Sequence, residues 1–457
     1  MAVVLKFGGT SVGTFGAVSR TMEIIASRLP EHPVVCVSAL SKVTDLLYGI
    51  ADSASSGAKE KLAEQMYGLR SRHLDLVCSL LSADPENCGR ASARVNEICD
   101  TLAAVVDSVT ALGDIPDRIK AVIISHGEIL SSTIICYALN SMGIRTGFAD
   151  ARRMIVTDSE YMCGEPQFGL TDRLVPEIVG EAFERGTPFA SDGKAADGAC
   201  NDAVITQGFI AANRQGAATV LGRGGSDWSA SIIASALGAS RVEIWTDVDG
   251  IRTTDPRVCP ATCRIPRISY GEAAQMAKFG AKVLHPKTIA PAVAQNIPVL
   301  VLNSSAPEGE GTAVVPEAGQ DGPRGIAFKR NVYLIRFSPA AGEDFRRCLD
   351  ECRIEPDILV PSGRQMMATI DFSYSLGTFI RLVAGKTDIL LKTGYSQMTV
   401  TGKGLLGLAS ELEEAVPMLR KNFGKMLDDS NLTYVVASGR LEETVRAAHR
   451  YLFERHI

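Results

Sequence analysis

The chain has 457 residues, of which 46% are hydrophobic and 22% are charged, and 47 basic against 52 acidic side chains give a net charge of −5. This composition excludes an intrinsically disordered chain. The near balance of charge excludes a general nucleic-acid binder and a polybasic membrane binder. A chain of this length is expected to form two or three domains, each with a sizeable core.

The N-terminal segment does not have the pattern of a signal peptide. Lys6 falls inside its short apolar run, and Gly8 and Gly9 end that run after a few residues. No apolar stretch in the sequence approaches the roughly 20 residues that a membrane span needs. We therefore expect a soluble, cytoplasmic protein with no membrane and no nucleic-acid partner.

The eleven cysteines are scattered, and none of them forms a CxxC pair. Two pairs, Cys259/Cys263 and Cys348/Cys352, are four residues apart, but neither has the second Cys/His pair that a zinc site needs. Unpaired thiols in a large chain are typical of a reducing compartment. No metal ligands are predicted from this pattern.

Short β-branched runs alternate with helical patterns over the first 305 residues. Strands are expected at 3–7, 34–37, 121–124, 203–206 and 297–301. Apolar residues at steps of three and four predict helices across 62–80 and 95–112. Such alternation predicts an α/β fold, in which a parallel-rich central sheet is sandwiched by helices.

A smaller α+β region is expected after this part of the chain. Residues 304–324 are rich in glycine, proline and acidic residues, which is typical of a linker. Beyond them, strands are expected at 333–337, 366–372 and 433–437, and helices at 343–352, 405–422 and 441–455. The predicted domains are therefore 1–305 and 326–457, joined by a linker at 306–325. A polar, glycine-rich loop is also expected at 187–202.

The first chemical motif, Lys6-Phe-Gly-Gly-Thr-Ser11, lies where the first strand ends. Its glycines let the backbone approach a ligand closely, and a turn of free N–H groups binds anions. A lysine beside them offers a mobile positive charge for a phosphate. The spacing fits neither a Walker A loop nor a GxGxxG fingerprint. The alternative is an ordinary strand-terminal turn with a solvated lysine.

The second motif, Leu221-Gly-Arg-Gly-Gly-Ser-Asp-Trp-Ser229, leads into an apolar helical stretch at 230–237. Ser226 or Asp227 is expected to cap that helix, which leaves its N–H groups and positive dipole end free for an anion. Arg223 is suited to bind a carboxylate in a bidentate manner. The alternative is an ordinary strand–turn–helix junction.

Two further motifs follow, Trp245-Thr-Asp-Val-Asp-Gly-Ile-Arg-Thr-Thr-Asp-Pro-Arg257 and Lys278-Phe-Gly-Ala-Lys-Val-Leu-His-Pro286. The first is typical of a strand that passes into an Asp/Gly turn. The second is typical of a helix end with a cap-like Gly280. Neither motif alone indicates a function.

Taken in order, these motifs resemble those of aspartokinases, ATP-dependent kinases of the aspartate β-carboxylate within the amino-acid kinase family. The strings KFGGTS, SHGE (125–128), TQGF (206–209), GRGGSD, WTDVDGI, TTDPR and FGAKVLHP all occur in the order of that family. The resemblance covers residues 1 to about 305 and implies the amino-acid kinase fold. The implied reaction makes 4-phospho-L-aspartate and ADP, the first step of the aspartate pathway to lysine, threonine and methionine.

The resemblance also assigns roles to individual residues. Lys6 is implied as the catalytic contact to the transferring phosphoryl group, with Asp227 orienting it. L-Aspartate is implied to contact Thr44, Glu128, Arg223 and Ser226. ATP, the co-substrate, is implied to contact Lys6, Phe7, Gly8, Gly9, Gly224, Gly225, Thr246, Asp247, Arg252, Arg257, Lys282 and Val283. Mg²⁺ is implied to bridge the phosphate oxygens without dedicated protein ligands.

Several of these residues also have ordinary structural interpretations. For Glu128, the alternative is an exposed acid in the first turn of a helix. Thr44 reads as the N-cap of a helix that starts at Asp45. His126 and His285 lie inside motifs, but a structural role is expected for both because neither has a second histidine at ligand spacing.

The C-terminal region resembles the ACT-like regulatory modules of the family, although it is short for two full modules. The resemblance implies an amino-acid effector and a homodimer or a dimer of dimers. The stretch Asp357-Ile-Leu-Val-Pro-Ser-Gly363 lacks the glutamate with which the family binds its effector. The region is therefore expected either to dimerise or to respond to another ligand.

Two other functions are alternatives to an active aspartokinase. One is a related kinase of glutamate or N-acetylglutamate, which the combination of KFGGTS, SHGE and FGAKVLHP disfavours. The other is a catalytically silent amino-acid sensor. A silent subunit should have lost its lysine or its glycine-rich loops, yet Lys6, Arg223 and Asp227 are all present.

Overall fold

The computed structural model describes residues 2–110, 113–184, 200–281, 284–319, 321–372, 377–383 and 389–454. Nearly all of the loop expected at 187–202 lies outside these ranges. Contacts divide the chain into two compact units, Met1–Gly250 with Lys287–Val315, and Ile251–Pro286 with Pro316–Ile457. This division differs from the expected boundaries, because residues 251–286 belong to the second unit. The Ile326 N–H donates to the Thr253 carbonyl there at 2.6 Å.

The first unit is built on a mainly parallel sheet. Its strands follow the order β3-β5-β2-β1-β8-β10-β11, and all these neighbours are parallel except β10 and β11. The bounds are β1 (Val4–Phe7), β2 (Val34–Val37), β3 (Thr146–Ala149), β5 (Ala203–Gln207), β8 (Val242–Thr246), β10 (Val299–Asn303) and β11 (Thr312–Val315). Every residue of β1, β2 and β5 is buried. Helices therefore cover both faces, as predicted for a parallel sheet.

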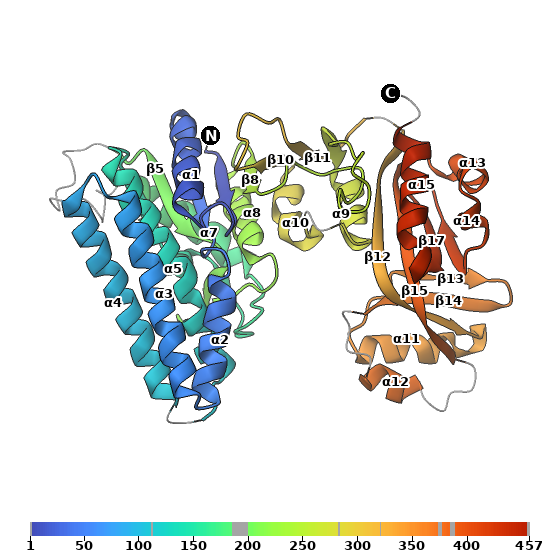
Figure 1. The fold of residues 1–457 in the computed structure, drawn as a ribbon, viewed down its shortest axis with the longest axis horizontal. Helices are drawn as coiled ribbons and strands as arrows, with labels where there is room; N and C mark the ends of the chain where they lie inside the picture. Colours follow the sequence, from blue (N-terminus) through green and yellow to red (C-terminus); the bar gives the residue numbers. More distant parts are fainter. Residues whose placement is uncertain are drawn as a thin grey trace. The chain divides into compact units, whose positions relative to one another are not determined.

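Most helices of the first unit are longer than its strands. They are α1 (Phe15–Arg28), η1 (Leu29–Glu31), α2 (Val43–Ser55), α3 (Lys59–Leu80), α4 (Pro85–Thr110), α5 (Asp117–Ser141), α6 (Ala151–Met154), α7 (Phe168–Glu184), α8 (Gly225–Leu237) and α10 (Pro286–Ala294). Helices α2 to α5 pack side by side as a bundle (Figure 1). A second, small sheet contains β4 (Val156–Thr157), β6 (Ile210–Asn213) and β7 (Ala218–Val220). Helices α3 and α4 confirm the predictions made from apolar spacing.

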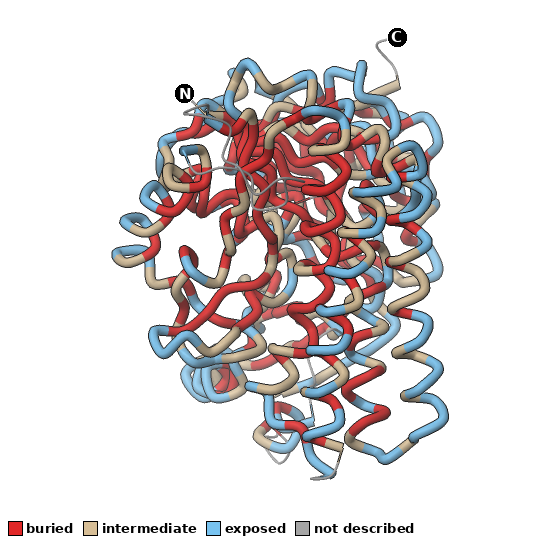
Figure 2. The backbone as a smooth tube through the Cα atoms, turned by 90° about the vertical axis from the view of Figure 1, so that its left-hand side faces the viewer, coloured by how far each residue is buried: buried red, intermediate tan, exposed pale blue. Residues whose placement is uncertain are grey.

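The strand predicted at 121–124 is wrong, because these residues belong to α5. The run is β-branched and apolar since α5 is a core helix, and periodicity cannot separate a buried helix from a buried strand over so few residues. Among the described helices, α5 is the one long and apolar enough to cross a membrane, and the sequence did not predict it. However, 89% of its most apolar window is buried inside the protein. Figure 2 shows that buried residues gather along the central strands, while the outer turns of the helices are exposed.

The second unit contains an antiparallel sheet in the order β13-β14-β12-β15-β17-β16. Its strands are β12 (Gly322–Phe337), β13 (Ile358–Ser362), β14 (Gln365–Asp371), β15 (Ile389–Lys403), β16 (Gly424–Leu427) and β17 (Asn431–Ala437). The unit also contains the short strand β9 (Arg267–Ser269), which is not part of this sheet. Its helices are α9 (Tyr270–Lys278), η2 (Pro339–Ala341), α11 (Gly342–Glu351), α12 (Gly377–Val383), η3 (Leu406–Leu408), α13 (Ala409–Ala415), α14 (Pro417–Arg420), η4 (Ser438–Arg440) and α15 (Leu441–Phe453).

Most elements predicted for the C-terminal region are present, with two differences. The predicted linker 306–325 contains β11 and the start of β12, so it is not irregular throughout. The single helix predicted at 405–422 is divided, because Pro417 cannot continue the hydrogen bonding of α13 and starts α14 instead. The sheet carries separate hydrophobic cores, one around Phe345 and Phe379 and another around Tyr434 and Leu412.

Candidate active site

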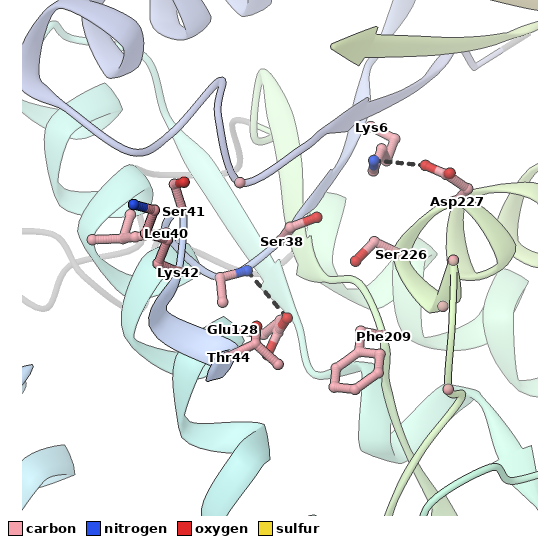
Figure 3. A pocket seen from close by; sticks show the side chains of 15 residues that line it. Lys6, Ser38, Leu40, Ser41, Lys42, Thr44, Glu128, Phe209, Ser226 and Asp227 are labelled. Atoms are coloured by element: carbon pink, nitrogen blue, oxygen red, sulfur yellow. Dashed lines mark hydrogen bonds and ion pairs between the residues drawn. The ribbon is translucent and has the colours of Figure 1, made fainter. Parts of the chain in front are cut away.

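A cavity of about 290 Å³ lies at the carboxyl ends of β1, β2 and β5. This edge of a parallel sheet is where ligands usually bind in open α/β folds. Figure 3 shows Lys6 and Asp227 at one end of the cavity and Glu128 and Thr44 at the other, with Ser226 between them. The full lining is Lys6, Gly9, Ser38, Ala39, Leu40, Ser41, Lys42, Thr44, Glu128, Phe209, Gly222, Gly224, Gly225, Ser226 and Asp227.

Lys6 and Asp227 form an ion pair at one end of the cavity. The Lys6 Nζ lies 2.6 Å from the Asp227 Oδ1, and the two side chains are only 11% and 19% exposed. Lys6 comes from β1 and Asp227 from the first turn of α8. A partly desolvated lysine held in one place by a carboxylate supplies a fixed positive charge for an anionic ligand.

Glu128 is buried at the other end of the cavity. It lies within α5 and is 2% exposed, so the alternative of an exposed acid in a first helical turn is wrong. Its Oε1 accepts a hydrogen bond from the Ala39 N–H at 3.1 Å, whereas its buried Oε2 has no hydrogen-bond partner. Burial raises the pKa of Glu128 to about 8. A cationic group entering the cavity would provide the missing partner.

Small residues let the segments around Glu128 pack closely. A Cβ on Gly127 would lie 2.8 Å from the Ala39 Cβ, so glycine is what allows α5 to approach the segment after β2. A Cβ on Gly9 would lie 2.9 Å from the Ala39 carbonyl oxygen. The Ser131 hydroxyl of α5 donates to the Ser38 carbonyl at 2.8 Å and fixes the same segment. The Ala39 N–H is thereby held toward Glu128.

Helix α8 points its N-terminus into the cavity. Gly224 adopts a left-handed conformation (φ +72°) at the N-cap, and the helix starts at Gly225. The prediction that Ser226 or Asp227 caps this helix is therefore wrong: both lie in its first turn, where their side chains are free to line the cavity. The free N–H groups and positive dipole end of this helix favour a bound anion.

Thr44 lines the cavity from the start of α2. The helix begins at Val43 after Lys42, which is left-handed (φ +65°). Thr44 is therefore not the N-cap of a helix starting at Asp45. It lies inside the first turn, and its hydroxyl is available to a ligand.

The structure does not bring every residue named from the sequence into this cavity. Arg223 is exposed and does not line it, although Gly222 and Gly224 do. Thr246 ends β8, and its hydroxyl donates to the exposed Asp247 at 3.2 Å.

Two arginines assigned to ATP belong to the second unit and have partners there. The Arg252 Nε donates to the Thr262 hydroxyl at 2.7 Å. Arg257 is exposed and forms an ion pair with Asp255 at 2.7 Å. Lys282 and Val283 lie outside the described residues.

One wall of the cavity was not predicted from the sequence. Residues 38–42, Ser-Ala-Leu-Ser-Lys, line it directly after β2. The available indication was their place at the end of a predicted buried strand, where parallel sheets bind ligands. Phe209 was also missed as a lining residue; it is left-handed (φ +65°), and its N–H donates to the Ser229 hydroxyl at 2.9 Å.

The sequence pattern of the amino acid kinase family matches residues 1–303. The chain is 31% identical to lysine-sensitive aspartokinase 3 of Escherichia coli over 478 aligned residues, which cover 99% of each chain. The chain belongs to the aspartokinases, within the amino acid kinase family. Its activity is therefore that of an aspartate kinase, and the resemblance proposed from its motifs is confirmed.

Solved structures of this family confirm the fold. The crystal structure of E. coli aspartokinase III in complex with aspartate and ADP (R-state) superposes with a TM-score of 0.81 at 27% identity, covering 99% of this chain and 100% of that one. Clostridium acetobutylicum aspartate kinase superposes with a TM-score of 0.77 at 20% identity, covering 98% of this chain and 100% of that one. The expected sheet sandwiched by helices and the smaller α+β region are thus those of aspartokinases.

Proposed function

We propose that L-aspartate binds in the cavity with its α-ammonium group at Glu128 and its β-carboxylate toward Lys6. The observation that carries this orientation is the buried Oε2 of Glu128, which has no partner in the structure. A buried carboxylate without a cation is costly, and an ammonium group would satisfy both its charge and its hydrogen bonding. Thr44, beside Glu128, and Ser226, between the two ends, offer hydroxyls to the substrate.

Phosphoryl transfer in this site depends on positioning and on neutralising charge. The enzyme phosphorylates the β-carboxylate with ATP and forms 4-phospho-L-aspartate and ADP, the first step toward lysine, threonine and methionine. No general base is needed, because the attacking carboxylate is already ionised at neutral pH. Lys6, held by Asp227 at 2.6 Å, stabilises negative charge as the phosphoryl group moves.

The glycine-rich segments would hold the phosphates of ATP. Gly8 and Gly9 follow β1, and Gly224 and Gly225 open α8, so both segments lie beside Lys6 and Asp227, although the Gly8 and Gly225 N–H groups already donate to the Trp245 and Gly222 carbonyls. The N–H groups of the first turn of α8 are proposed to meet the phosphates. The family resemblance adds Phe7, Thr246, Asp247, Arg252, Arg257, Lys282 and Val283. The cavity brings no group of three metal-ligating side chains together among its described residues. Mg²⁺ would therefore arrive with the nucleotide and keep water and phosphate oxygens as its ligands.

The second unit is proposed to regulate the kinase. One solved relative, E. coli aspartokinase III in its T-state, is a complex with lysine and aspartate (TM-score 0.77, 28% identity). In this chain Asp357 is buried and its carboxylate lies 2.6 Å from the Lys329 Nζ. An amino-acid effector that binds beside Asp357 would therefore either leave this ion pair intact or take the place of Lys329 in it. A homodimer or dimer of dimers in the cytoplasm completes the proposal.

The direct test of this function is an acyl-hydroxamate assay. Purified protein with MgATP and hydroxylamine should form hydroxamate from aspartate and not from glutamate. Parallel reactions with lysine and with threonine would show whether the second unit senses either amino acid. A folded, ATP-binding protein that makes no hydroxamate from aspartate would contradict the proposal and favour a silent sensor.

A further inference from the structure

Three side chains with metal-binding atoms converge in the second unit, outside the kinase cavity. Cys259 follows the Thr-Thr-Asp-Pro-Arg motif, His449 lies in α15, and Glu454 comes directly after that helix. Within the described ranges, this is the one group of at least three cysteine, histidine or acidic side chains whose ligand atoms all lie within 4.8 Å of one another. Cys259 is 4% exposed and His449 is fully buried.

One of the three distances in this group is that of two ligands on a common metal ion, and the other two differ from it by about half an ångström or less. The Cys259 Sγ lies 3.4 Å from the His449 Nδ1 and 3.9 Å from the Glu454 Oε1. The His449 Nδ1 and the Glu454 Oε1 are 2.8 Å apart. Tetrahedral coordination of zinc by sulfur, nitrogen and oxygen separates its ligand atoms by about 3.3–3.6 Å. The Cys259–His449 distance is therefore already in this range, whereas a zinc ion would need Glu454 about 0.3 Å closer to Cys259 and about half an ångström farther from His449.

The other ring nitrogen of His449 is already held in the manner typical of a metal ligand. The His449 Nε2 lies 2.9 Å from the Thr253 hydroxyl, which also accepts the Cys263 N–H at 3.1 Å. When the Nε2–H donates to Thr253, the Nδ1 lone pair faces Cys259 and Glu454. Metal-binding histidines almost always have such a second partner, which fixes the tautomer and the ring orientation.

We propose that Cys259, His449 and Glu454 bind a divalent metal ion of the zinc class, with water as the fourth ligand. Binding releases the thiol proton to solvent, because only the thiolate coordinates. The thiolate and the carboxylate then balance the two positive charges of the ion, so the site is neutral where Cys259 and His449 are buried. Thiolate and imidazole ligands favour zinc over magnesium or calcium.

Such an ion would join the segment after the Thr-Thr-Asp-Pro-Arg motif to the last helix of the chain. Val258, the neighbour of Cys259, already packs in the hydrophobic core that α15 completes with Val445 and Leu452. The alternative is that the same three side chains share ordinary hydrogen bonds, with the His449 Nδ1–H donating to Glu454. The two arrangements differ in whether the intact protein takes up a metal ion.

The test is zinc binding by the full-length protein after treatment with a chelator. Dialysis against limiting ZnCl₂ should leave one tightly bound zinc per chain in the wild type and in Cys263→Ser. Cys263 is the matched control, since it lies in the same segment, is exposed and stands outside the group. Cys259→Ser should lower the affinity for this zinc ion at least about 100-fold. Addition of zinc should raise the melting temperature only when Cys259 is present.

A cobalt substitution identifies the ligands directly. Co²⁺ added to the wild type should produce the near-ultraviolet thiolate-to-cobalt charge-transfer band, and Cys259→Ser should abolish it while Cys263→Ser keeps it. If Cys259→Ser does not fold, Glu454→Gln replaces it in the test, because it changes a partly exposed side chain. This variant should lower the affinity for zinc at least about 10-fold. Equal zinc uptake and equal cobalt spectra in the wild type and in Cys259→Ser or Glu454→Gln would overturn the proposal.

Discussion

The Nζ of Lys6 lies 2.6 Å from the Oδ1 of Asp227, although Lys6 lies in β1 and Asp227 in α8, far apart in the sequence. This ion pair places a fixed positive charge where two glycine-rich segments meet. Phosphoryl transfer is catalysed mainly by such preorganised charges. We therefore expect the turnover of this aspartokinase to be most sensitive to substitutions in this pair.

Lys6→Ala should lower kcat by about 100-fold or more, as is usual when one charge that stabilises a transition state is removed. The KM for aspartate should change much less, since the far end of the substrate is proposed to bind Glu128. Steady-state kinetics with the hydroxamate assay would measure both constants. Lys59→Ala, an exposed lysine at the start of α3, is the control and should behave as wild type. Near-normal turnover by a folded Lys6→Ala enzyme would contradict the role of this lysine.

Glu128 should make the ligand-free enzyme less stable as the pH rises. Its folded-state pKa, about 8, lies above its value in an unfolded chain, so its contribution to stability is full below about pH 4.5 and is lost as the pH rises through 8. Glu128→Gln cannot lose a proton and should not show this loss. One pKa unit corresponds to about 1.4 kcal/mol. The difference in the free energy of unfolding between wild type and Glu128→Gln should therefore change by a few kcal/mol between pH 5 and pH 9.

Urea unfolding of wild type and Glu128→Gln across this pH range would measure the difference. Glu23→Gln, which changes an exposed acid on α1, is the control and should follow the wild type. Parallel stability curves for wild type and Glu128→Gln would show that Glu128 is not a perturbed acid.

Gly9→Ala should impair aspartate binding although Gly9 is remote from Glu128 in sequence. The new Cβ would lie 2.9 Å from the Ala39 carbonyl oxygen and 3.3 Å from the Ser41 backbone, so the segment that holds Glu128 must move. We expect a KM for aspartate raised about 10-fold or more, with some loss of stability.

Gly16→Ala is the matched substitution for Gly9→Ala. Gly16 lies in α1, and its Cβ would meet only the end of Arg20 at 3.8 Å. Because alanine is favoured over glycine within a helix, this variant should gain about 0.5–1 kcal/mol of stability and keep its kinetics. An equal change in the KM for aspartate in Gly9→Ala and Gly16→Ala would show that the packing around Gly9 does not affect substrate binding.

Arg223→Ala should raise the KM for aspartate if this arginine binds a substrate carboxylate, as the family resemblance implies. Arg223 is exposed in the structure and would have to reach the cavity when the substrate binds. Arg173→Ala, an exposed arginine of α7, is the control. If the KM is unchanged in Arg223→Ala but raised in Lys42→Ala, the cation that binds the carboxylate is the lysine that lines the cavity.

Local patterns in the sequence were sufficient for several strands of the sheet but not for β3 and β11, and the pairing of Lys6 with Asp227 was expected only from the family resemblance. The β-branched runs at β1, β2 and β5 and the apolar spacing of α3 and α4 gave their elements correctly, because these elements are long or strongly patterned. They failed at α5, where Ala121 to Ile124 look like a strand only because this helix is buried on all sides. The same failure made Glu128 look like an exposed acid.

Contacts between distant segments could not be predicted from spacing. Cys259 and His449 are 190 residues apart, so the sequence showed two unrelated residues where the structure places their side chains in contact. Likewise, the boundary between the two units depends on Thr253 bonding to β12 and to α15, which no local composition reveals.

The central claim is that Glu128 receives the α-ammonium group of aspartate, and proton release on binding tests it most directly. Burial raises the pKa of Glu128 to about 8, so its carboxyl group is mostly protonated at pH 7 in the empty cavity. An ammonium group beside it favours the ionised form and expels that proton. Titration calorimetry of aspartate binding in buffers of different ionisation enthalpy should show nearly one proton released by the wild type and none by Glu128→Gln, which should also bind more weakly. Equal proton release by the two proteins would contradict the account.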